Sequence, residues 1–255
     1  MKVTPTFHSL PLELGNFSTL VEALDYAAKG ETGYNFYSGR GQLYAVLSYA
    51  NLRSEARILA RKLIDLGVAR GSRVALVADT HPDFVRFFFA CQYAGLTPVP
   101  LPAKIQLGGR KKYIDQLERL LSICRAELAM ATDDFLPFLT EAAENLDIKF
   151  LGNPQSFDNL PESTTELRPK GEKDLAYLQY TSGSTRVPRG VMITQEEVLH
   201  NLSLIIQHGV KIRPGDRAVS WLPFFHDMGL VGLLLVPLAC QISVDFLSTR
   251  DFAMR

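Results

Sequence analysis

The residues best suited to chemistry lie in one polar stretch, YLQYTSGSTRVPRGVMIT, residues 177–194. Its candidates for phosphate contact are Thr181, Ser182, Gly183, Ser184, Thr185, Arg186, Arg189 and Gly190. Gly183 and Gly190 permit positive φ, so neighbouring backbone N–H groups could converge on one anion. The planar fork of an arginine also suits phosphate oxygens. These residues by themselves support a phosphate-binding loop and a solvated hairpin loop about equally.

The spacing of this stretch excludes two common nucleotide-binding loops. The two glycines are seven positions apart, and no Lys-Ser or Lys-Thr pair opens a helix, so the loop is not a Walker A motif. The G-x-G-x-x-G pattern of dinucleotide-binding folds is also absent.

A second candidate is the pair His226–Asp227 within WLPFFHDMGLVGLLLVPL, residues 221–238. A histidine beside an aspartate in an apolar stretch is more often a structural pair than a reactive one. Asp227 would then orient His226. The apolar residues after the pair indicate core packing, or alternatively the wall of an acyl pocket.

Both stretches resemble motifs of the adenylate-forming superfamily. The first is similar to its phosphate loop, Tyr/Phe-Thr-Ser-Gly-Ser/Thr-Thr-Gly-x-Pro-Lys-Gly-Val, with Arg186 at the usual glycine and Arg189 at the usual lysine. The second resembles the Leu-Pro-x-x-His-Asp-Met-Gly-Leu motif of the fatty acyl-AMP ligase branch. The apolar helix and strand segments upstream are also similar to the N-terminal units of that family, so the resemblance spans nearly the whole chain.

The resemblance implies that the enzyme activates a fatty acid with ATP, giving acyl-AMP and pyrophosphate. It places residues 181–185 and Arg189 at the β- and γ-phosphates, whereas Arg186 contacts phosphate or faces solvent. It also implies a catalytic position for His226, with His226, Asp227, Met228 and Gly229 at the acyl–adenylate pocket. We expect His226 to gate or position and not to act as a base, because an ionised carboxylate needs no general base.

The family resemblance also implies partners and missing parts. The acyl group would pass to an acyl carrier protein of a lipid, polyketide or nonribosomal peptide pathway. Two alternatives remain: a long-chain acyl-CoA synthetase, and a non-catalytic nucleotide- or acyl-binding module. The Mg²⁺ ligand and a mobile C-terminal domain of the family are expected beyond residue 255, and these 255 residues show no metal site. We therefore expect an N-terminal portion that is inactive alone and that self-associates or pairs with the missing part.

Composition limits the remaining functional classes. Lys+Arg and Asp+Glu both number 27, so no net charge attracts nucleic acid. The most apolar segment, residues 228–240, is shorter than the roughly 20 residues of a membrane span and contains a proline. We predict a cytoplasmic protein whose three cysteines are buried and reduced.

The elements that must position these residues follow an α/β pattern. Helices are expected over residues 47–68, 81–95, 110–126, 134–145 and 195–209. Strands are expected over residues 73–79, 127–132, 148–152, 175–180 and 190–194, with a further strand ending near residue 222. Residues 96–102, rich in proline, indicate an edge strand or a loop. Alternation of strands with helices predicts mostly parallel sheets flanked by helices, as in an incomplete N-terminal AMP-binding domain.

The chain divides by texture into three parts within this one domain of residues 1–255. Residues 1–152 form a first α/β block, residues 153–174 a polar connector without periodicity, and residues 175–255 a phosphate-loop block.

Three weaker candidates lie outside the two motifs. Trp221 is expected in the core, His200 and His208 lack a third zinc ligand, and the basic run 108–113 is expected to be a solvated helix start.

Overall fold

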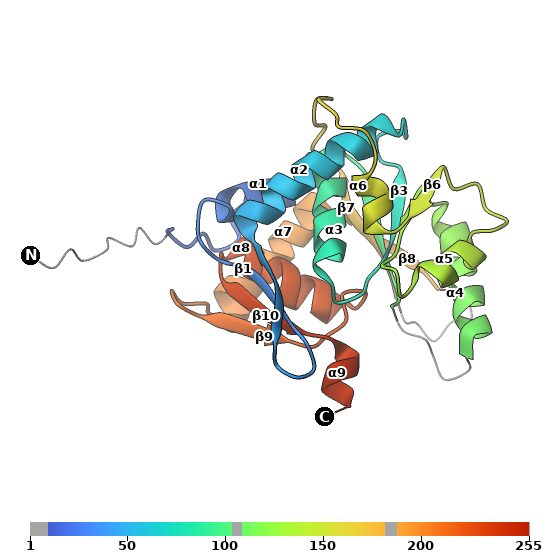
Figure 1. The fold of residues 1–255 in the computed structure, drawn as a ribbon. Coiled ribbons are helices and arrows are strands. Elements are labelled where there is room, and N and C mark those ends of the chain that lie inside the picture. The colour runs from blue at the N-terminus through green and yellow to red at the C-terminus, as the bar shows by residue number, and fades with distance from the viewer. Residues whose placement is uncertain (1–9, 104–108, 182–187, 255) are drawn as a thin grey trace, which may run out of the picture.

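The computed structural model describes residues 10–103, 109–181 and 188–254, arranged as two four-stranded sheets and one two-stranded hairpin with helices packed around them. Figure 1 shows helices α2 and α3 running between the two larger sheets, with α4 and α5 on the outer side of one of them. The expected class, mostly parallel sheets flanked by helices, is confirmed.

The first sheet has the order β2-β1-β10-β9 and combines strands from both ends of the sequence. Its strands are β1 (Gly33–Tyr37), β2 (Leu43–Ser48), β9 (Arg217–Ser220) and β10 (Ser243–Leu247). β1 pairs with β2 antiparallel, whereas β10 lies parallel to both β1 and β9. Residues before 152 and residues after 175 therefore contribute strands to one sheet.

The second sheet is fully parallel, with the order β4-β3-β5-β6. Its strands are β3 (Arg73–Val77), β4 (Thr97–Leu101), β5 (Leu128–Met130) and β6 (Phe150–Gly152). Val74 and Leu76 of β3 face one apolar cluster, and Ala75 and Val77 face the other. Helices cover both faces, which is why these strands read as continuous apolar runs without alternation.

The helices carry the apolar periodicity that the sequence predicts. Their bounds are α1 (Leu20–Ala27), α2 (Tyr49–Asp65), α3 (Pro82–Ala94), α4 (Gly109–Cys124), α5 (Leu136–Ala142), α6 (Pro154–Asp158), α7 (Gln195–Leu204), η1 (Ile205–Val210), η2 (Met228–Leu235), α8 (Val236–Ala239) and α9 (Thr249–Ala253). Helix α3 starts at a proline and ends at Gly95, which adopts φ 73° and closes the last turn. The helix expected to end at Gly209 continues from α7 as the π-helical segment η1.

The proline-rich segment 96–102 forms β4, which is a buried strand. Thr97 N–H donates to Ser72 O of the loop before β3 (2.9 Å), so the N–H groups of alternate residues point toward β3. Pro98 and Pro100 occupy the positions between, where the missing N–H would face away from β3. Strand β7 (Leu175–Tyr180) packs along that side. The prediction of an edge strand is thus correct, because β4 forms ladder hydrogen bonds with β3 only. The other side of β4 is nevertheless covered by β7.

The connector 153–174 is more ordered than its composition suggested. It opens with the short helix α6, which is capped by Asn153, whose Oδ1 accepts from Ser156 N–H at 2.8 Å. Later, Arg168 N–H and Lys170 N–H donate to the carbonyls of Tyr93 and Gln92 at the end of α3. The sequence of the connector did not predict these contacts, because the accepting carbonyls belong to a helix that is distant in the sequence.

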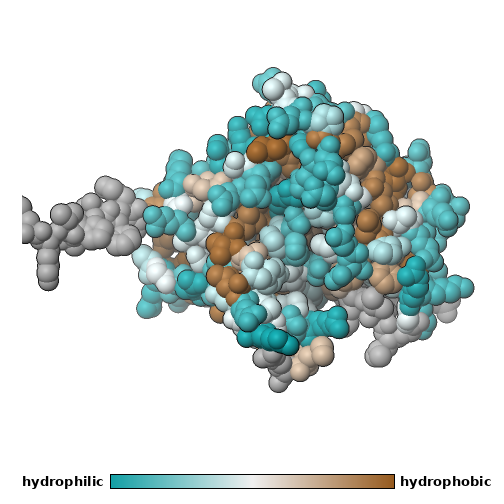
Figure 2. Space-filling model, in the orientation of Figure 1, coloured by the Kyte–Doolittle hydropathy of each residue, from teal (hydrophilic) through white to brown (hydrophobic). Residues whose placement is uncertain are grey.

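The exposed surface is largely polar on the face shown in Figure 2, with apolar patches between charged side chains. In the described part of the chain, no helix is both long enough and apolar enough to cross a membrane. The most apolar segment of the sequence, residues 228–240, forms η2 and α8 and is mostly buried in the core.

Candidate functional site

The predicted phosphate loop connects the two strands of a hairpin. β7 pairs antiparallel with β8 (Gly190–Thr194), and the ladder continues to the mouth of the loop, where Thr181 N–H donates to Arg189 O at 3.0 Å. Five predicted residues, Ser182, Gly183, Ser184, Thr185 and Arg186, lie outside the described residues. The structure thus locates the two ends of the loop at Thr181 and Pro188.

Thr181, Arg189 and Gly190 are exposed at this mouth. Arg189 forms no ion pair with any side chain of the described part, so its charge is available to an anion. Gly190 permits a positive φ but does not adopt one. A Cβ there would come within 2.7 Å of Leu178 Cδ2 across the hairpin, so cross-strand packing explains the glycine.

Buried hydrogen bonds fix the hairpin to the rest of the molecule. Gln92 Nε2 donates to Ala176 O of β7 (2.8 Å), and Gln195 Nε2 donates to Gln92 Oε1 (2.7 Å). Leu20 N–H then donates to Gln195 Oε1 (2.9 Å). Both glutamines are fully buried, so this chain of amides joins α1, α3, β7 and α7 where water cannot compete.

The second motif follows β9 as a tight turn. His226 N–H donates to Pro223 O at 3.1 Å, and His226 Nδ1 lies 2.6 Å from Asp227 Oδ1. Asp227 Oδ1 also accepts from Met228 N–H at 2.7 Å and so caps η2. The pair is exposed, with 56% of the His226 side chain accessible. Asp227 therefore holds one ring nitrogen, which leaves Nε2 free for a ligand.

Met228 and Gly229 have different environments. The side chain of Met228 is exposed, whereas Gly229 is buried. A Cβ on Gly229 would lie 2.2 Å from Pro223 O, far below any normal contact distance. Gly229 is therefore required by a close approach of two backbone segments. A bulky residue there would disturb the fold before it could report on acyl chain length.

The two motifs lie next to each other. Gln179 of β7 donates from Nε2 to Phe225 O, the residue before His226, at 3.3 Å. Tyr177 on the same strand is buried, and burial together with the negative charge of Asp227 raises the pKa of its phenol. The hairpin stem and the His226 segment are thus in contact, although 46 residues separate Gln179 from Phe225.

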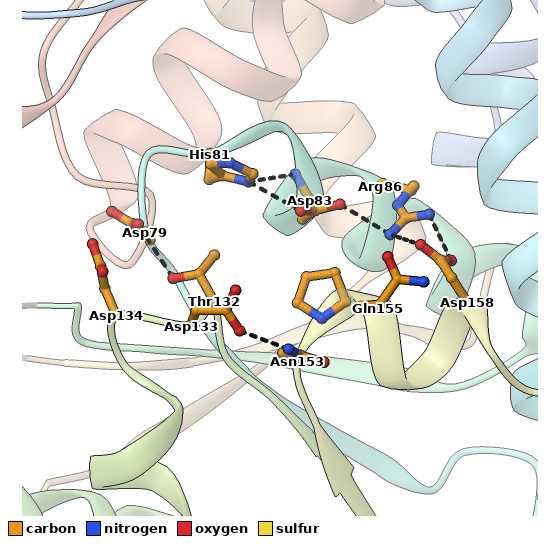
Figure 3. A pocket seen from close by; sticks show the side chains of 11 residues that line it. Asp79, His81, Asp83, Arg86, Thr132, Asp133, Asp134, Asn153, Gln155 and Asp158 are labelled. Carbon is orange, nitrogen blue, oxygen red and sulfur yellow. Dashed lines mark hydrogen bonds and ion pairs between the residues drawn. The ribbon is translucent and has the colours of Figure 1, made fainter.

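Sequence reasoning missed a polar cavity at the carboxyl ends of the parallel strands. It has a volume of about 400 Å³ and is shown in Figure 3. The residues that line it are Asp79, His81, Asp83, Arg86, Thr132, Asp133, Asp134, Asn153, Pro154, Gln155 and Asp158. The available signal was the polar residues directly after β3, β5 and β6. None of the described residues of the two motifs lines this cavity.

The polar groups of this cavity mainly satisfy one another. Arg86 bridges Asp83 (2.9 Å) and Asp158 (2.8 Å), which joins the start of α3 to α6. Burial pushes the pKa of Asp83 upward, but the hydrogen bond with His81 and the charge of Arg86 outweigh it and leave this pKa below its usual value. Burial raises the pKa of Asp79. The network therefore accounts for the docking of α6 as a structural contact.

The weaker candidates have structural explanations. Trp221 is not a core residue: it is 40% exposed and stacks on Phe252, with ring centroids 4.0 Å apart. The three cysteines are free and buried, as expected. In the basic run, Arg110 pairs with Glu141 and lies over the ring of Phe138. Within the described residues, no group of three His, Cys, Asp or Glu side chains could hold a metal ion.

Comparison with known proteins gives a consistent set of relatives. A Caulobacter vibrioides protein, whose name assigns it to the acyl-CoA synthetases, is 43% identical over all of this chain and 44% of its own length. The medium-chain-fatty-acid–[acyl-carrier-protein] ligase JamA of Moorena producens is 32% identical over 94% of this chain and 41% of its own length. The chain therefore spans less than half the length of these relatives.

Solved structures that resemble this chain include ligases of the same kind as these relatives. One from a study of fatty acyl-adenylate ligases of E. coli and L. pneumophila superposes with a TM-score of 0.92 at 48% identity, covering 96% of this chain and 44% of that one. Another, a fatty acyl-adenylate ligase of L. pneumophila in complex with acyl adenylate and pyrophosphate, has a TM-score of 0.81 at 26% identity, covering 97% and 42%. The AMP-binding enzyme family matches residues 25–254, and the chain belongs to that family.

Proposed function

We propose that this chain is the N-terminal part of an enzyme that joins a fatty acid to AMP. The carrying observation is the contact between the phosphate-loop hairpin and the His226 segment in a member of the AMP-binding family. In the reaction, a carboxylate oxygen attacks the α-phosphorus of ATP, the bond to the bridging oxygen breaks, and pyrophosphate leaves. Such a reaction depends on positioning and on charge stabilisation more than on acid–base groups.

Residues at the hairpin would hold the leaving pyrophosphate. Thr181 and the loop residues 182–185 supply hydroxyl and N–H donors, and Arg189 adds a cation at the mouth. A guanidinium fork can bind two phosphate oxygens at once, whereas a lysine ammonium would act as a point charge. Arg186 would either contact phosphate or face solvent. Gly190 serves the hairpin's packing and would also lie beside the phosphates at the loop mouth.

His226 would position the substrates at the junction between acyl chain and adenylate. Its Nδ1 is engaged by Asp227, and its ring is exposed and so accessible to a substrate. The next residue, Met228, is also exposed and would contact the acyl chain. The ring need not remove a proton, because the fatty acid carboxylate is ionised at neutral pH.

Magnesium ions accompany ATP, yet the described residues contain no group of three or more His, Cys, Asp or Glu side chains that could hold one. No step of the reaction is therefore assigned to a metal held by residues 10–103, 109–181 or 188–254. We propose that the Mg²⁺ ligand belongs to the part of the enzyme that extends beyond residue 255. We further propose that the 255 residues alone do not turn over and self-associate through apolar surface that is covered in the longer protein.

The acyl acceptor separates two candidate functions. The name of JamA, an acyl-carrier-protein ligase, supports transfer to a carrier protein. The name of the Caulobacter relative, which is more similar in sequence, supports transfer to coenzyme A. We propose the carrier protein, because a solved structure from a study of fatty acyl-adenylate ligases is more similar still, at 48% identity, and both motifs resemble that branch. The test is to offer the active enzyme holo acyl carrier protein and coenzyme A in parallel, and preferential formation of acyl-CoA would overturn this part of the proposal.

The central test uses a chimera of residues 1–255 followed by the remainder of the Caulobacter relative. It should catalyse fatty-acid-dependent exchange of labelled pyrophosphate into ATP. Thr185→Ala should lower this exchange about tenfold or more, since removing one preorganised donor typically costs this much. Thr140→Ala, at an exposed position on α5, serves as the matched control. Undiminished exchange by the Thr185 variant would contradict phosphate binding by this loop.

A further inference from the structure

Strand β7 presents two different faces, which separate its side chains by function. Leu178 and Tyr180 point toward α4: Leu178 belongs to the apolar cluster there, and the Tyr180 hydroxyl donates to Leu120 O at 2.8 Å. Side chains alternate along a strand, so Tyr177 and Gln179 point the other way. That second face meets the His226 segment, where Gln179 donates to Phe225 O.

The acceptor, the Phe225 carbonyl, belongs to a segment that internal hydrogen bonds and close packing hold together as one unit. His226 N–H donates to Pro223 O (3.1 Å), and Leu230 N–H donates to His226 O (2.8 Å). The buried Gly229 packs directly on the Pro223 carbonyl. A displacement of the Phe225 carbonyl would therefore carry His226 with it.

The donor, Gln179, lies on β7 close to the mouth of the phosphate loop. Gln179 lies opposite Val191 in the hairpin register, and the next pair is Tyr180 with Gly190. One step further, the Thr181–Arg189 hydrogen bond closes the loop mouth. Thr181, the first residue of the predicted phosphate contact, thus follows Gln179 by only two positions in the sequence.

We propose that Gln179 is a positioning residue that sets the distance between the phosphate-loop hairpin and the His226 segment. The inference rests on the proposed function, in which one motif holds the phosphates of ATP and the other borders the fatty acid carboxylate. An attack in line with the leaving pyrophosphate requires both ends to be held together. A misplacement of about 1 Å at such a site can reduce a rate about a hundredfold.

The first test uses the 255-residue chain and needs no activity. Gln179→Met keeps the length of the side chain but removes the donor, and backbone amide exchange is followed by NMR or mass spectrometry. The amides of His226 and Leu230 should exchange several times faster than in the unsubstituted chain. The matched control is Gln207→Met, which removes another amide donor to a backbone carbonyl, Leu14 O at 3.2 Å. Unchanged exchange at His226 and Leu230 overturns the inference.

The second test measures pyrophosphate exchange in the chimera. Gln179→Met should lower kcat about tenfold or more, while the KM for ATP stays within twofold, because each substrate still binds but the two are misaligned. Gln207→Met should leave both constants unchanged. A rise in the KM for ATP with unchanged kcat would overturn the positioning role. If the unsubstituted chimera shows no exchange with any fatty acid, the proposed function fails, and the amide-exchange test still decides whether Gln179 holds the segment.

Discussion

Lys170 provides the sharpest test of the energetics of this fold. It lies in the connector, is only 5% exposed, and donates from Nζ to Thr97 Oγ1 at 2.8 Å. Burial lowers the pKa of its ammonium to about 8, although Asp174 opposes this change. The predicted perturbation is Lys170→Met, which keeps a long unbranched side chain and removes the buried charge.

The sign and size of the effect follow from proton linkage. Between pH 8 and the ordinary value of 10.5, the unfolded chain keeps a proton on Lys170 that the folded chain has lost. Stability therefore rises with pH across this window, and the full cost of the buried charge is present below pH 8. Because one pKa unit is about 1.4 kcal/mol, the difference between these values corresponds to an upper limit of about 3 kcal/mol.

The variant should therefore be more stable than the unsubstituted chain at pH 7. The loss of the hydrogen bond to Thr97 offsets about 1 kcal/mol of the gain, so a net stabilisation of about 1–2 kcal/mol is expected. Urea unfolding followed by circular dichroism, at half-unit steps from pH 7 to 10, gives both free energies of unfolding. The difference between the two free energies of unfolding should shrink steadily above pH 8. Taking this difference cancels the contributions of the cysteines and tyrosines that both proteins share.

Lys173→Met is the matched control, because Lys173 lies in the same connector but is exposed. It should change the unfolding free energy by less than about 0.5 kcal/mol, as is usual for surface substitutions. The reasoning about Lys170 is refuted if Lys170→Met destabilises the protein at pH 7, or if the stability difference is independent of pH.

Two further predictions concern the packing of Gly229 and the buried hydrogen bonds of Gln195. Gly229→Ala should lower the free energy of unfolding by more than about 2 kcal/mol, since its Cβ would meet a backbone carbonyl. Gly232→Ala should cost clearly less, because its Cβ would meet only the flexible side chain of Met228 at 3.1 Å; equal costs in a urea titration would contradict this explanation. Gln195→Ala should cost about 2–3 kcal/mol by leaving Leu20 N–H and Gln92 Oε1 buried without partners. Its control is Gln207→Ala at an exposed position, and a loss no larger than that of the control would show that the buried chain of amides contributes little.

Local sequence patterns determined the elements and the two motifs. The spacing of apolar residues gave α2, the proline and glycine punctuation gave α3, and Thr194 with Glu197 formed the capping box that starts α7. These features depend on contacts within a few residues, so they are legible without the fold. The same holds for the residue types of the phosphate loop and for the pair His226–Asp227.

Tertiary structure alone decided how these pieces meet. The pairing of β1 with β10 joins residues about 210 positions apart, and no local pattern encodes that partner. The same is true of the buried Gln92–Gln195 contact, of the buried site of Lys170, and of the polar cavity formed by three separate loops. The exposed position of Trp221 beside Phe252, and the close packing of Gly229 on the Pro223 carbonyl, also depend on how the folded chain brings these segments together. The sequence specified which groups could do chemistry, whereas their mutual placement is a property of long-range packing that only the folded chain contains.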